Sequence, residues 1–587
     1  MNIHKQRVEA LRELMKKNKF DAFIVLSADS HLSEYLPEHF KTRVFMSGFK
    51  GSVGTLLISQ KDAFLFVDGR YFLQAQKELN GSTISLQKQD FLSFMKENFN
   101  NTHKIGTDFS VLSYELYKNL KEFVNLSDKD LVSKLWQDRP ALPDAEIYEH
   151  ENKYCFNTRD KKLELIREKM LSLNAQAHLI SSLDDIAWIT NLRGSDVSFN
   201  PVFLSHLLIL KNEALLFVNE SKIPNKLKAK LEKDGFCLCA YESLQKHLKT
   251  LKNTTLLLES TKIATSFVLN LDKSVKLIEQ INPSTFLKSC KSPKEIKFIQ
   301  DAMIEDGVAL CKFFAWLEEA IKNEKISELD IDTKLTEFRK QSPLYISNSF
   351  ATIAGFDKNA ALPHYRASKE SFSYLKKDGL LLLDSGAQYQ NGTTDITRVV
   401  PLGKVNKEQI LDYTLVLKAN IAMSSLIFPK NVPMPLLDSV ARTPLWALGL
   451  DYMHGTGHGV GYFLNVHEGP QVLSYFAPVL EKTRAKEGMI TSIEPGLYRA
   501  GKWGIRLENL VANANVKKSE FGEFLGFKIL TLCPFEPNFI DLSLLDEKEK
   551  TWLKTYNKEV FEKLAPNLKD KKALAWLEKR TINFKIS

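Results

Sequence analysis

Residues 380–398, LLLLDSGAQYQNGTTDITR, and residues 490–511, ITSIEPGLYRAGKWGIRLENLV, decide the fold of the larger part of this chain. Both stretches have the apolar runs of buried strands, yet each contains two acidic residues. These are Asp384, Asp395, Glu494 and Glu508. Burying a lone carboxylate costs far more than one contact recovers, so each must be paired, protonated or coordinated. One acidic residue in a strand is usually an edge residue, but four indicate a functional site.

The second stretch predicts a pair of carboxylates. The positions of Glu494 and Glu508 are symmetric about Gly501, so a tight hairpin centred on that glycine sets the two residues opposite each other. Directly opposed side chains have Cβ atoms about 4.5–5.5 Å apart, which is close enough to share a metal ion.

The register of the first stretch depends on where its turn lies. A two-residue turn at Asn391-Gly392 places Asp384 and Asp395 on one face. It also displaces them by about four residues, roughly 13 Å along the strand, which is too far to bridge one ion. The alternatives are a turn centred earlier, near residues 389–390, or a bulge that shifts the register.

Four histidines fall in the same region, namely His364, His454, His458 and His467. HGTGHGVG, residues 454–461, contains four glycines, which disfavour a helix and let the backbone approach closely. We therefore expect only one of His454 and His458 to bind metal. Four carboxylates and one histidine form a hard ligand set that favours Mn, Fe, Co or Mg. Four negative charges also balance two divalent ions, a known device for activating water.

The first half of the chain contains an internal repeat. DAFIVLS at 21–27 recurs as QAHLISS at 176–182, and DAFLFVD at 62–68 recurs as EALLFVN at 213–219. Each copy follows a helical pattern and is typical of strands in a sheet covered by helices. The sequence therefore predicts two similar α/β domains, separated near 139–143, where two prolines remove amide donors.

A third, larger domain is predicted to follow. It begins with a long amphipathic helix over residues 293–323, and the chain ends in a proline-containing segment and helical patterns that we expect to pack on it. The predicted domain boundaries are 1–141, 142–287, 288–525 and 526–587.

The composition excludes several classes of protein. Hydrophobic residues make up 44% and charged residues 26% of the 587, as in globular rather than collagen-like or disordered chains. The net charge of +9 is spread along the chain and does not indicate nucleic-acid binding. No apolar run approaches the roughly 18 residues of a membrane helix, and the N-terminus does not resemble a signal peptide. Six cysteines in no framework spacing predict reduced, mostly buried thiols and a cytoplasmic protein.

The motifs together resemble those of the metallopeptidases with the pita-bread fold, which include methionine aminopeptidase, prolidase and aminopeptidase P. The segments that carry the resemblance are LLLDSGAQYQNGTTDITR, HGTGHGVG, SIEPGLY and IRLEN. SFATIAGFDKNAALPHY at 349–365, the repeated domains and the tail from 530 resemble the long, three-domain cytosolic aminopeptidase P. The resemblance implies an α/β (α+β) fold: two creatinase-like α/β domains, then a pita-bread catalytic domain with a C-terminal extension.

The resemblance also implies a ligand set for two divalent metal ions. Asp384 would bind one ion alone, while Asp395 and Glu508 would bridge both. His458 and Glu494 would complete the second site. The expected ion is Mn²⁺, with Co²⁺, Fe²⁺ and Zn²⁺ as alternatives.

The same resemblance assigns residues to catalysis and substrate binding. His364 and His467 would line the substrate pocket and His454 would lie near the scissile bond. Tyr498 and Arg506 would form a supporting pair for the substrate. Glu494 would handle the proton in addition to binding metal.

The activity implied is hydrolysis of the bond between an N-terminal residue and a following proline, by a hydroxide that bridges the two metals. The expected partners are peptides with an Xaa-Pro N-terminus and a second copy of the chain, with neither nucleic acid nor membrane. The alternatives are a prolidase-type Xaa-Pro dipeptidase and a non-catalytic pita-bread binding module. A binding module would be indicated by lost ligands, and all five are present here.

Overall fold

The computed structural model describes residues 2–586. The chain divides into two compact units. The first contains the chain up to His150 together with Asn157–Thr285, and the second contains Glu151–Phe156 and the chain from Phe286 onward. Within the described residues, none of the helices combines the length and the hydropathy that a membrane crossing requires.

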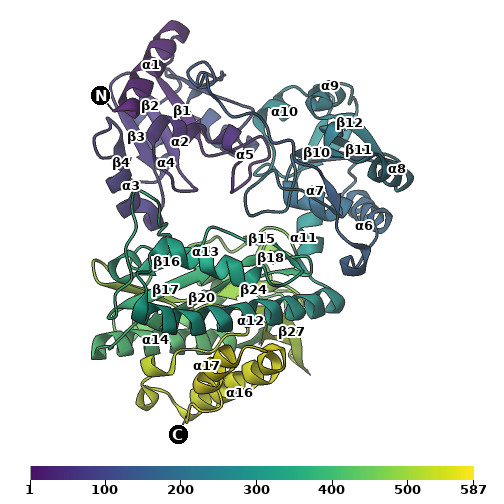
Figure 1. The fold of residues 1–587 in the computed structure, drawn as a ribbon. Helices are drawn as coiled ribbons and strands as arrows, with labels where there is room; N and C mark the ends of the chain where they lie inside the picture. Colours follow the sequence, from purple (N-terminus) through teal and green to yellow (C-terminus); the bar gives the residue numbers. More distant parts are fainter. Residues whose placement is uncertain (1, 587) are drawn as a thin grey trace. The chain divides into compact units, whose positions relative to one another are not determined.

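The first unit contains two six-stranded sheets with the same strand order. Figure 1 labels β1 to β4 of the first sheet and β10 to β12 of the second. The first sheet runs β4 (Ser85–Gln87), β3 (Ala63–Phe66), β2 (Thr55–Ser59), β1 (Ala22–Leu26), β5 (Lys104–Thr107) and β6 (Asn125–Asp128). The second runs β12 (Phe236–Ala240), β11 (Ala214–Val218), β10 (Ser205–Leu210), β8 (Ala177–Ile180), β13 (Thr255–Leu258) and β14 (Lys276–Glu279). Pairing directions agree as well, since β1 is antiparallel to β2 and parallel to β5, as β8 is to β10 and β13. The predicted duplication is confirmed.

Amphipathic helices accompany both sheets. In α1 (Ile3–Asn18), Val8, Leu11 and Met15 are fully buried, and the Asn2 side chain accepts hydrogen bonds from the first turn. The other helices of this unit are α2 (Thr42–Ser47), α3 (Phe72–Glu78), α4 (Phe91–Asn98), α5 (Tyr114–Lys121), α6 (Arg159–Ser172), α7 (Leu183–Thr190), α8 (Asn225–Lys233), α9 (Leu244–Leu248) and α10 (Thr265–Leu269).

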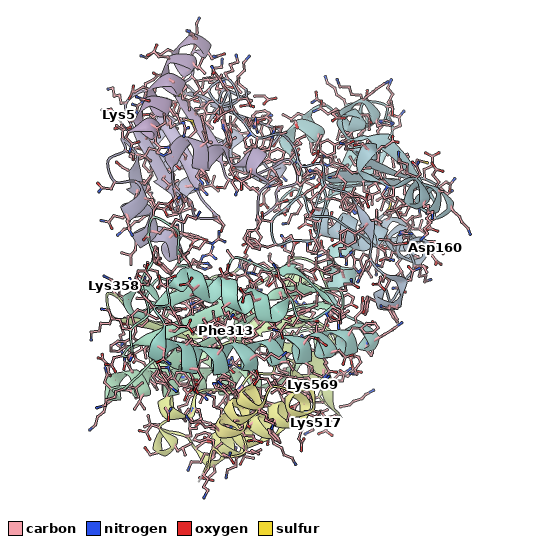
Figure 2. All side chains as sticks on the ribbon, in the orientation of Figure 1. Lys5, Asp160, Phe313, Lys358, Lys517 and Lys569 are labelled. Atoms are coloured by element: carbon pink, nitrogen blue, oxygen red, sulfur yellow. The ribbon has the colours of Figure 1, made fainter. Side chains whose placement is uncertain are left out.

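The second unit begins with the end of α11 (Pro283–Ser289) and with α12 (Pro293–Asn323), which spans the predicted range. Ser292 and Glu295 form a reciprocal capping box at its start, and Pro293 occupies the first helical position. The buried face of α12, which includes Phe313 (labelled in Figure 2), forms one core with α13 (Glu328–Arg339) and the sheet β16 (Ile353–Phe356), β17 (Leu380–Ser385) and β20 (Ile396–Pro401).

The remaining strands of this unit form one four-stranded sheet and three smaller ones, and the predicted glutamates lie at the ends of β24, β25, β26 and β27. A four-stranded sheet runs β21 (Ile427–Pro429), β28 (Gly522–Ile529), β27 (Asn509–Ser519) and β24 (Ile490–Ile493). A three-stranded sheet contains β15 (Tyr345–Asn348), β18 (Ala387–Tyr389) and β19 (Gly392–Thr393). Two further sheets have two strands each. One pairs β22 (Gly457–His458) with β23 (Val472–Leu473), and the other pairs β25 (Gly496–Arg499) with β26 (Trp503–Arg506). Helices α14 (Lys407–Ser424) and α15 (Asp438–Trp446) lie between β20 and β22 in the chain.

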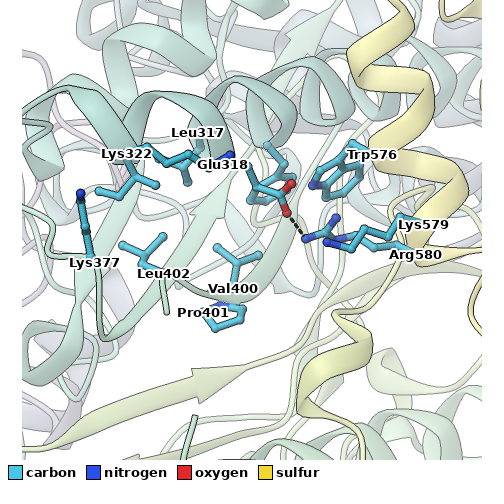
Figure 3. A pocket seen from close by; sticks show the side chains of 12 residues that line it. Leu317, Glu318, Lys322, Lys377, Val400, Pro401, Leu402, Trp576, Lys579 and Arg580 are labelled. Carbon is cyan, nitrogen blue, oxygen red and sulfur yellow. Dashed lines mark hydrogen bonds and ion pairs between the residues drawn. The ribbon is translucent and has the colours of Figure 1, made fainter. Parts of the chain in front are cut away.

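The C-terminal helices α16 (Glu547–Leu564) and α17 (Lys571–Arg580) pack on α12. Trp576 stacks on Phe314 with ring centroids 5.3 Å apart. Gly307 permits a close approach of the tail, because a Cβ there would lie 2.5 Å from the carbonyl oxygen of Leu532. A cavity of about 340 Å³ lies between α12, β20 and α17 (Figure 3), and no predicted site residue lines it.

The cysteines differ from expectation. Cys311 and Cys533 are buried, but Cys237 is exposed and the other three are partly exposed. Cys237 lies on β12, an edge strand of its sheet. The prediction of mostly buried thiols is therefore wrong, because an apolar run on an edge strand still presents one face to solvent.

Candidate metal centre

Glu494 and Glu508 lie between two antiparallel strand pairs that share one register. Both ladders, β24 with β27 and β25 with β26, pair residues that are symmetric about Gly501, for example Ile493 with Asn509. Gly501 has a φ of +74°, the left-handed conformation that a tight turn requires. The predicted hairpin register is confirmed, and it gives the two glutamates opposed positions.

The hairpin that carries Asp384 and Asp395 has a different register from either predicted turn. Tyr389 pairs with Gly392, so residues 390–391 form the turn. The predicted turn at Asn391-Gly392 lies one residue after the observed turn. The alternative near 389–390 lies one residue before it.

This register shortens the separation of the two aspartates. Asp384 pairs with Thr397, which is two residues after Asp395. The two aspartates are therefore offset by about two residues, or roughly 7 Å, along the strand. The hairpin also bends between β17 and β18 at Gly386, where a Cβ would lie 2.0 Å from the carbonyl oxygen of Thr394. Only a glycine fits this close approach, which changes the direction of the strand beside both aspartates.

Backbone hydrogen bonds hold the ligand-bearing segments together. The Glu494 amide donates to the Thr456 carbonyl at 2.7 Å, and the Glu508 amide donates to the Thr397 carbonyl at 3.1 Å. Gly457 allows the first of these approaches, since a Cβ there would lie 1.8 Å from the carbonyl oxygen of Ser492. The glycine-rich segment thus brings its histidine against the hairpin.

The side chains meet in one cluster. Ligand atoms of Asp395, His458 and Glu508 all lie within 4.8 Å of one another. His458 Nε2 lies 3.6 Å from Asp395 Oδ2 and 3.4 Å from Glu494 Oε1. Asp384 accepts a hydrogen bond from Arg506, whose Nη2 lies 2.5 Å from Asp384 Oδ2, and its charge acts on Asp395. The four carboxylates singled out from the sequence are therefore neighbours of one another and of one histidine.

Burial and mutual repulsion make this cluster unfavourable without a cation. Burial raises the pKa of Asp395 well above its ordinary value, and the Glu508 and Asp384 carboxylates raise it further. Burial also raises the pKa of Glu508 well above its ordinary value, with Glu494 adding to the effect, and raises the pKa of Glu494 to about 7. Asp384 Oδ1 and Glu508 Oε1 are buried without a hydrogen-bond partner in the described residues. Repelling carboxylates with unsatisfied oxygens fit divalent metal ions.

The orientation of His458 fits a role as a ligand. Its Nδ1 lies 3.0 Å from the carbonyl oxygen of Gly459, which fixes the tautomer with the proton on Nδ1. Nε2 then presents a lone pair toward Asp395 and Glu494, as a metal ligand requires.

The other predicted residues are placed around this cluster. Tyr498 OH accepts from Arg506 Nη1 at 2.8 Å and lies 2.8 Å from His454 Nε2. Burial raises the pKa of Tyr498 to about 12, so the phenol stays protonated at neutral pH. The rings of His467 and His458 are edge to face, with centroids 4.3 Å apart. His364 lies in the loop between β16 and β17, and its association with the pocket rests on the resemblance alone.

Two hydroxyl side chains at the cluster were not predicted. Thr397 Oγ1 donates to Glu508 Oε2 at 2.8 Å, and Ser492 Oγ donates to Glu494 Oε1 at 3.1 Å. Each precedes or follows a carboxylate by two positions, since Thr397 follows Asp395 and Ser492 precedes Glu494. In a strand this spacing puts both side chains on one face, a signal that was available in the sequence.

The cluster predicts an unusual pH dependence for the metal-free protein. A carboxyl group whose folded pKa is raised contributes stability below its unfolded pKa, and this is lost as pH rises through the folded pKa. Replacing Glu494, whose pKa rises from 4.5 to about 7, with glutamine should therefore flatten the decrease in unfolding free energy between pH 5 and pH 8. The expected difference is on the order of 3 kcal/mol. Urea unfolding of both metal-free proteins at the two pH values measures it, and parallel pH profiles would contradict it.

Comparisons with known proteins agree with this architecture. A model described as the creatinase/prolidase N-terminal domain matches residues 7–136, and a second model with that description matches 138–295. Metallopeptidase family M24 matches residues 297–513, and the C-terminal region of peptidase M24 matches 523–584.

Individual relatives match over very different shares of the chain. A probable Xaa-Pro aminopeptidase P of Coprinopsis cinerea is 38% identical, covering 98% of each chain. The crystal structure of an X-prolyl aminopeptidase from Caenorhabditis elegans, described as a cytosolic enzyme with a di-nuclear active site, has a TM-score of 0.93 and 29% identity, covering 98% of this chain and 99% of its own. A prolidase from Pyrococcus horikoshii covers 64% of this chain and 99% of its own, with a TM-score of 0.50 and 26% identity. With its buried carboxylate cluster, two creatinase-like domains and a match along almost its whole length, the chain belongs to metallopeptidase family M24.

Proposed function

We propose that this protein is a metalloaminopeptidase that hydrolyses the bond between an N-terminal residue and a proline at the second position. The observation that carries the proposal is the convergence of four carboxylates and His458 at one buried site. The extent of similarity supports it, because relatives named as Xaa-Pro aminopeptidases match along almost the whole chain. The hydrolase activity follows from membership of a metallopeptidase family.

The cluster would hold two divalent ions. We assign Asp384 to one ion, Asp395 and Glu508 to both, and His458 and Glu494 to the second. The hard oxygen donors favour Mn²⁺, although Co²⁺, Fe²⁺ or Zn²⁺ would also fit such a set. Bound there, the ions would lower the pKa of a water molecule and polarise the substrate carbonyl.

The chain's own residues would handle the proton and orient the substrate. Glu494 accepts a hydrogen bond from Ser492 within the cluster, and we assign it to take a proton from the attacking water. Arg506 donates to both Asp384 and Tyr498, and thereby fixes the phenol beside His454. We assign His454, His467 and His364 to substrate binding and catalysis. A proline amide offers no N–H, so an enzyme for this bond must hold the substrate by other groups.

The main alternative is a prolidase that accepts only Xaa-Pro dipeptides. The matched prolidase covers 64% of this chain, whereas the X-prolyl aminopeptidase from Caenorhabditis elegans covers 98%. A non-catalytic binding module is disfavoured because the carboxylates and His458 are present together.

A panel of three substrates tests the proposal. With Mn²⁺ bound, Arg-Pro-Pro should be cleaved with a higher kcat/KM than either Arg-Pro or a Met-Ala-Ser peptide, and should release only its first residue. Hydrogen-bond and shape complementarity at the second position should separate the best and worst substrates by about 100-fold or more. A faster dipeptide identifies a prolidase, and a faster Met-Ala-Ser peptide means that the proposed proline pocket is absent.

We also propose that the protein is a cytosolic homodimer. The structural relative from Caenorhabditis elegans is described as cytosolic. An exposed aromatic cluster supports self-association, since Trp446, Tyr475 and Phe476 are 43%, 44% and 50% exposed and the Tyr475 ring contacts the other two. Sedimentation at micromolar concentration should give twice the chain mass of 67.0 kDa, and a single 67.0 kDa species would contradict the dimer.

A further inference from the structure

A second buried charge cluster lies beside the candidate metal centre. Glu468 is 3% exposed, and its carboxylate lies between two lysine side chains from far earlier in the chain. Lys291 Nζ donates to Glu468 Oε1 at 2.5 Å, and Lys288 Nζ lies 3.3 Å from Glu468 Oε2. Both lysines are 5% exposed or less. Ion pairs this deeply buried depend on exact geometry, because the desolvation of each charge must be offset by its partner.

The lysines are fixed by the backbone of the catalytic unit. Lys288 lies in the last turn of α11, and Lys291 directly precedes the capping box of α12. The Lys291 amide donates to the Gly488 carbonyl at 2.9 Å, just before β24. Through these lysines, Glu468 is attached to the junction of α11, α12 and β24.

Glu468 in turn fixes the loop that carries His467. This loop, residues 459–471, connects β22 to β23, which pair through His458 and Val472. The Glu468 amide donates to the Gly459 carbonyl at 2.8 Å, which closes the loop directly behind His458. Gly461 leaves room for the carboxylate, because a Cβ there would lie 3.0 Å from Glu468 Oε2.

We propose that Lys291, assisted by Lys288, is a positioning residue that holds His467 against His458 through Glu468. His467 is adjacent to Glu468 in sequence, and its ring meets that of His458 at a centroid distance of 4.3 Å. Both lysines contact Glu468, so their effect on His467 passes through the loop. The inference rests on the proposed function, in which His467 binds substrate and His458 binds metal.

A double-mutant cycle on the full-length Mn²⁺-loaded protein tests the route of this effect. Lys291→Met leaves the Lys288–Glu468 pair and should lower kcat/KM for Arg-Pro-Pro by about 10- to 100-fold, as the loss of a supporting partner commonly does. In a His467→Ala background the same substitution should cost no more than about threefold, because the residue through which it acts is gone. Lys297→Met, which changes an exposed lysine in the second turn of α12, is the matched control and should leave kcat/KM unchanged. Losses that multiply in the double variant, or a Lys291→Met protein with unchanged kcat/KM, would overturn the proposal.

A second readout requires neither metal nor activity. With ¹³Cε1-labelled histidine in the metal-free protein, the His467 resonance is identified by its absence in His467→Ala. Lys291→Met should shift this resonance, whereas Lys297→Met should not; an unchanged resonance would overturn the proposal. If Lys291→Met does not fold by circular dichroism, Lys291→Gln, which retains a donor, replaces it in both experiments. Failure of the wild-type protein to cleave Arg-Pro-Pro would refute the proposed function, while the resonance would still decide whether Lys291 positions His467.

Discussion

Replacing Asp395 with alanine is expected to lower kcat/KM for Arg-Pro-Pro by about 10³-fold or more, equivalent to roughly 4 kcal/mol of lost transition-state stabilisation. Asp395 lies at the centre of the cluster, near both His458 and Glu508. As the proposed ligand shared by two ions, it cannot be lost without disturbing both sites. Steady-state kinetics under saturating Mn²⁺ measures the effect.

The same substitution should have the opposite effect on the stability of the metal-free protein. Burial and neighbouring carboxylates raise the pKa of Asp395, so its charge destabilises the fold above neutral pH. Asp395→Ala should therefore unfold at a higher urea concentration than wild type at pH 8. Asp301→Ala, which removes a surface carboxylate paired with Lys297, is the control for both measurements. Activity above a few percent with both metals retained would refute the assignment of Asp395.

Removal of metal ions is expected to abolish activity reversibly. Chelation leaves the buried carboxylates of Asp384, Asp395, Glu494 and Glu508 repelling one another, and of these Asp384 has an ion pair with Arg506. Dialysis against a chelator should reduce turnover of Arg-Pro-Pro to background, and Mn²⁺ should restore it better than Zn²⁺, because the donor set is hard. Full restoration by Zn²⁺ with Mn²⁺ ineffective would contradict this order.

The two hairpins show which parts of the site were predictable. The Glu494–Glu508 register followed from symmetry about Gly501, since no bulge interrupts either ladder. The other hairpin was not predictable from its Asn391-Gly392 pair, which usually marks a two-residue turn. Here Asn391 Nδ2 donates to the Phe298 carbonyl at 3.2 Å. Contacts with α12 therefore accompany a turn one residue earlier.

Residues far apart in sequence explain what else the sequence did not reveal. Lys291 and Glu468 are separated by 177 positions, and nothing local to either indicates an ion pair. The glycines of the 454–461 segment predicted close approach, but the partner of Gly457 is Ser492 on another strand. Repeats and periodicity specify elements and domains, whereas such pairings emerge only when the strands are assembled.

The most direct test of the central claim measures metal content and turnover on the same samples. Metal-free protein is titrated with Mn²⁺, the ions per chain are counted by native mass spectrometry, and the release of arginine from Arg-Pro-Pro is followed at each step. The account predicts that turnover rises only as ions bind, reaches its maximum at two ions per chain, and yields free arginine and Pro-Pro. Full turnover without bound metal, or two bound ions without arginine release, would contradict it.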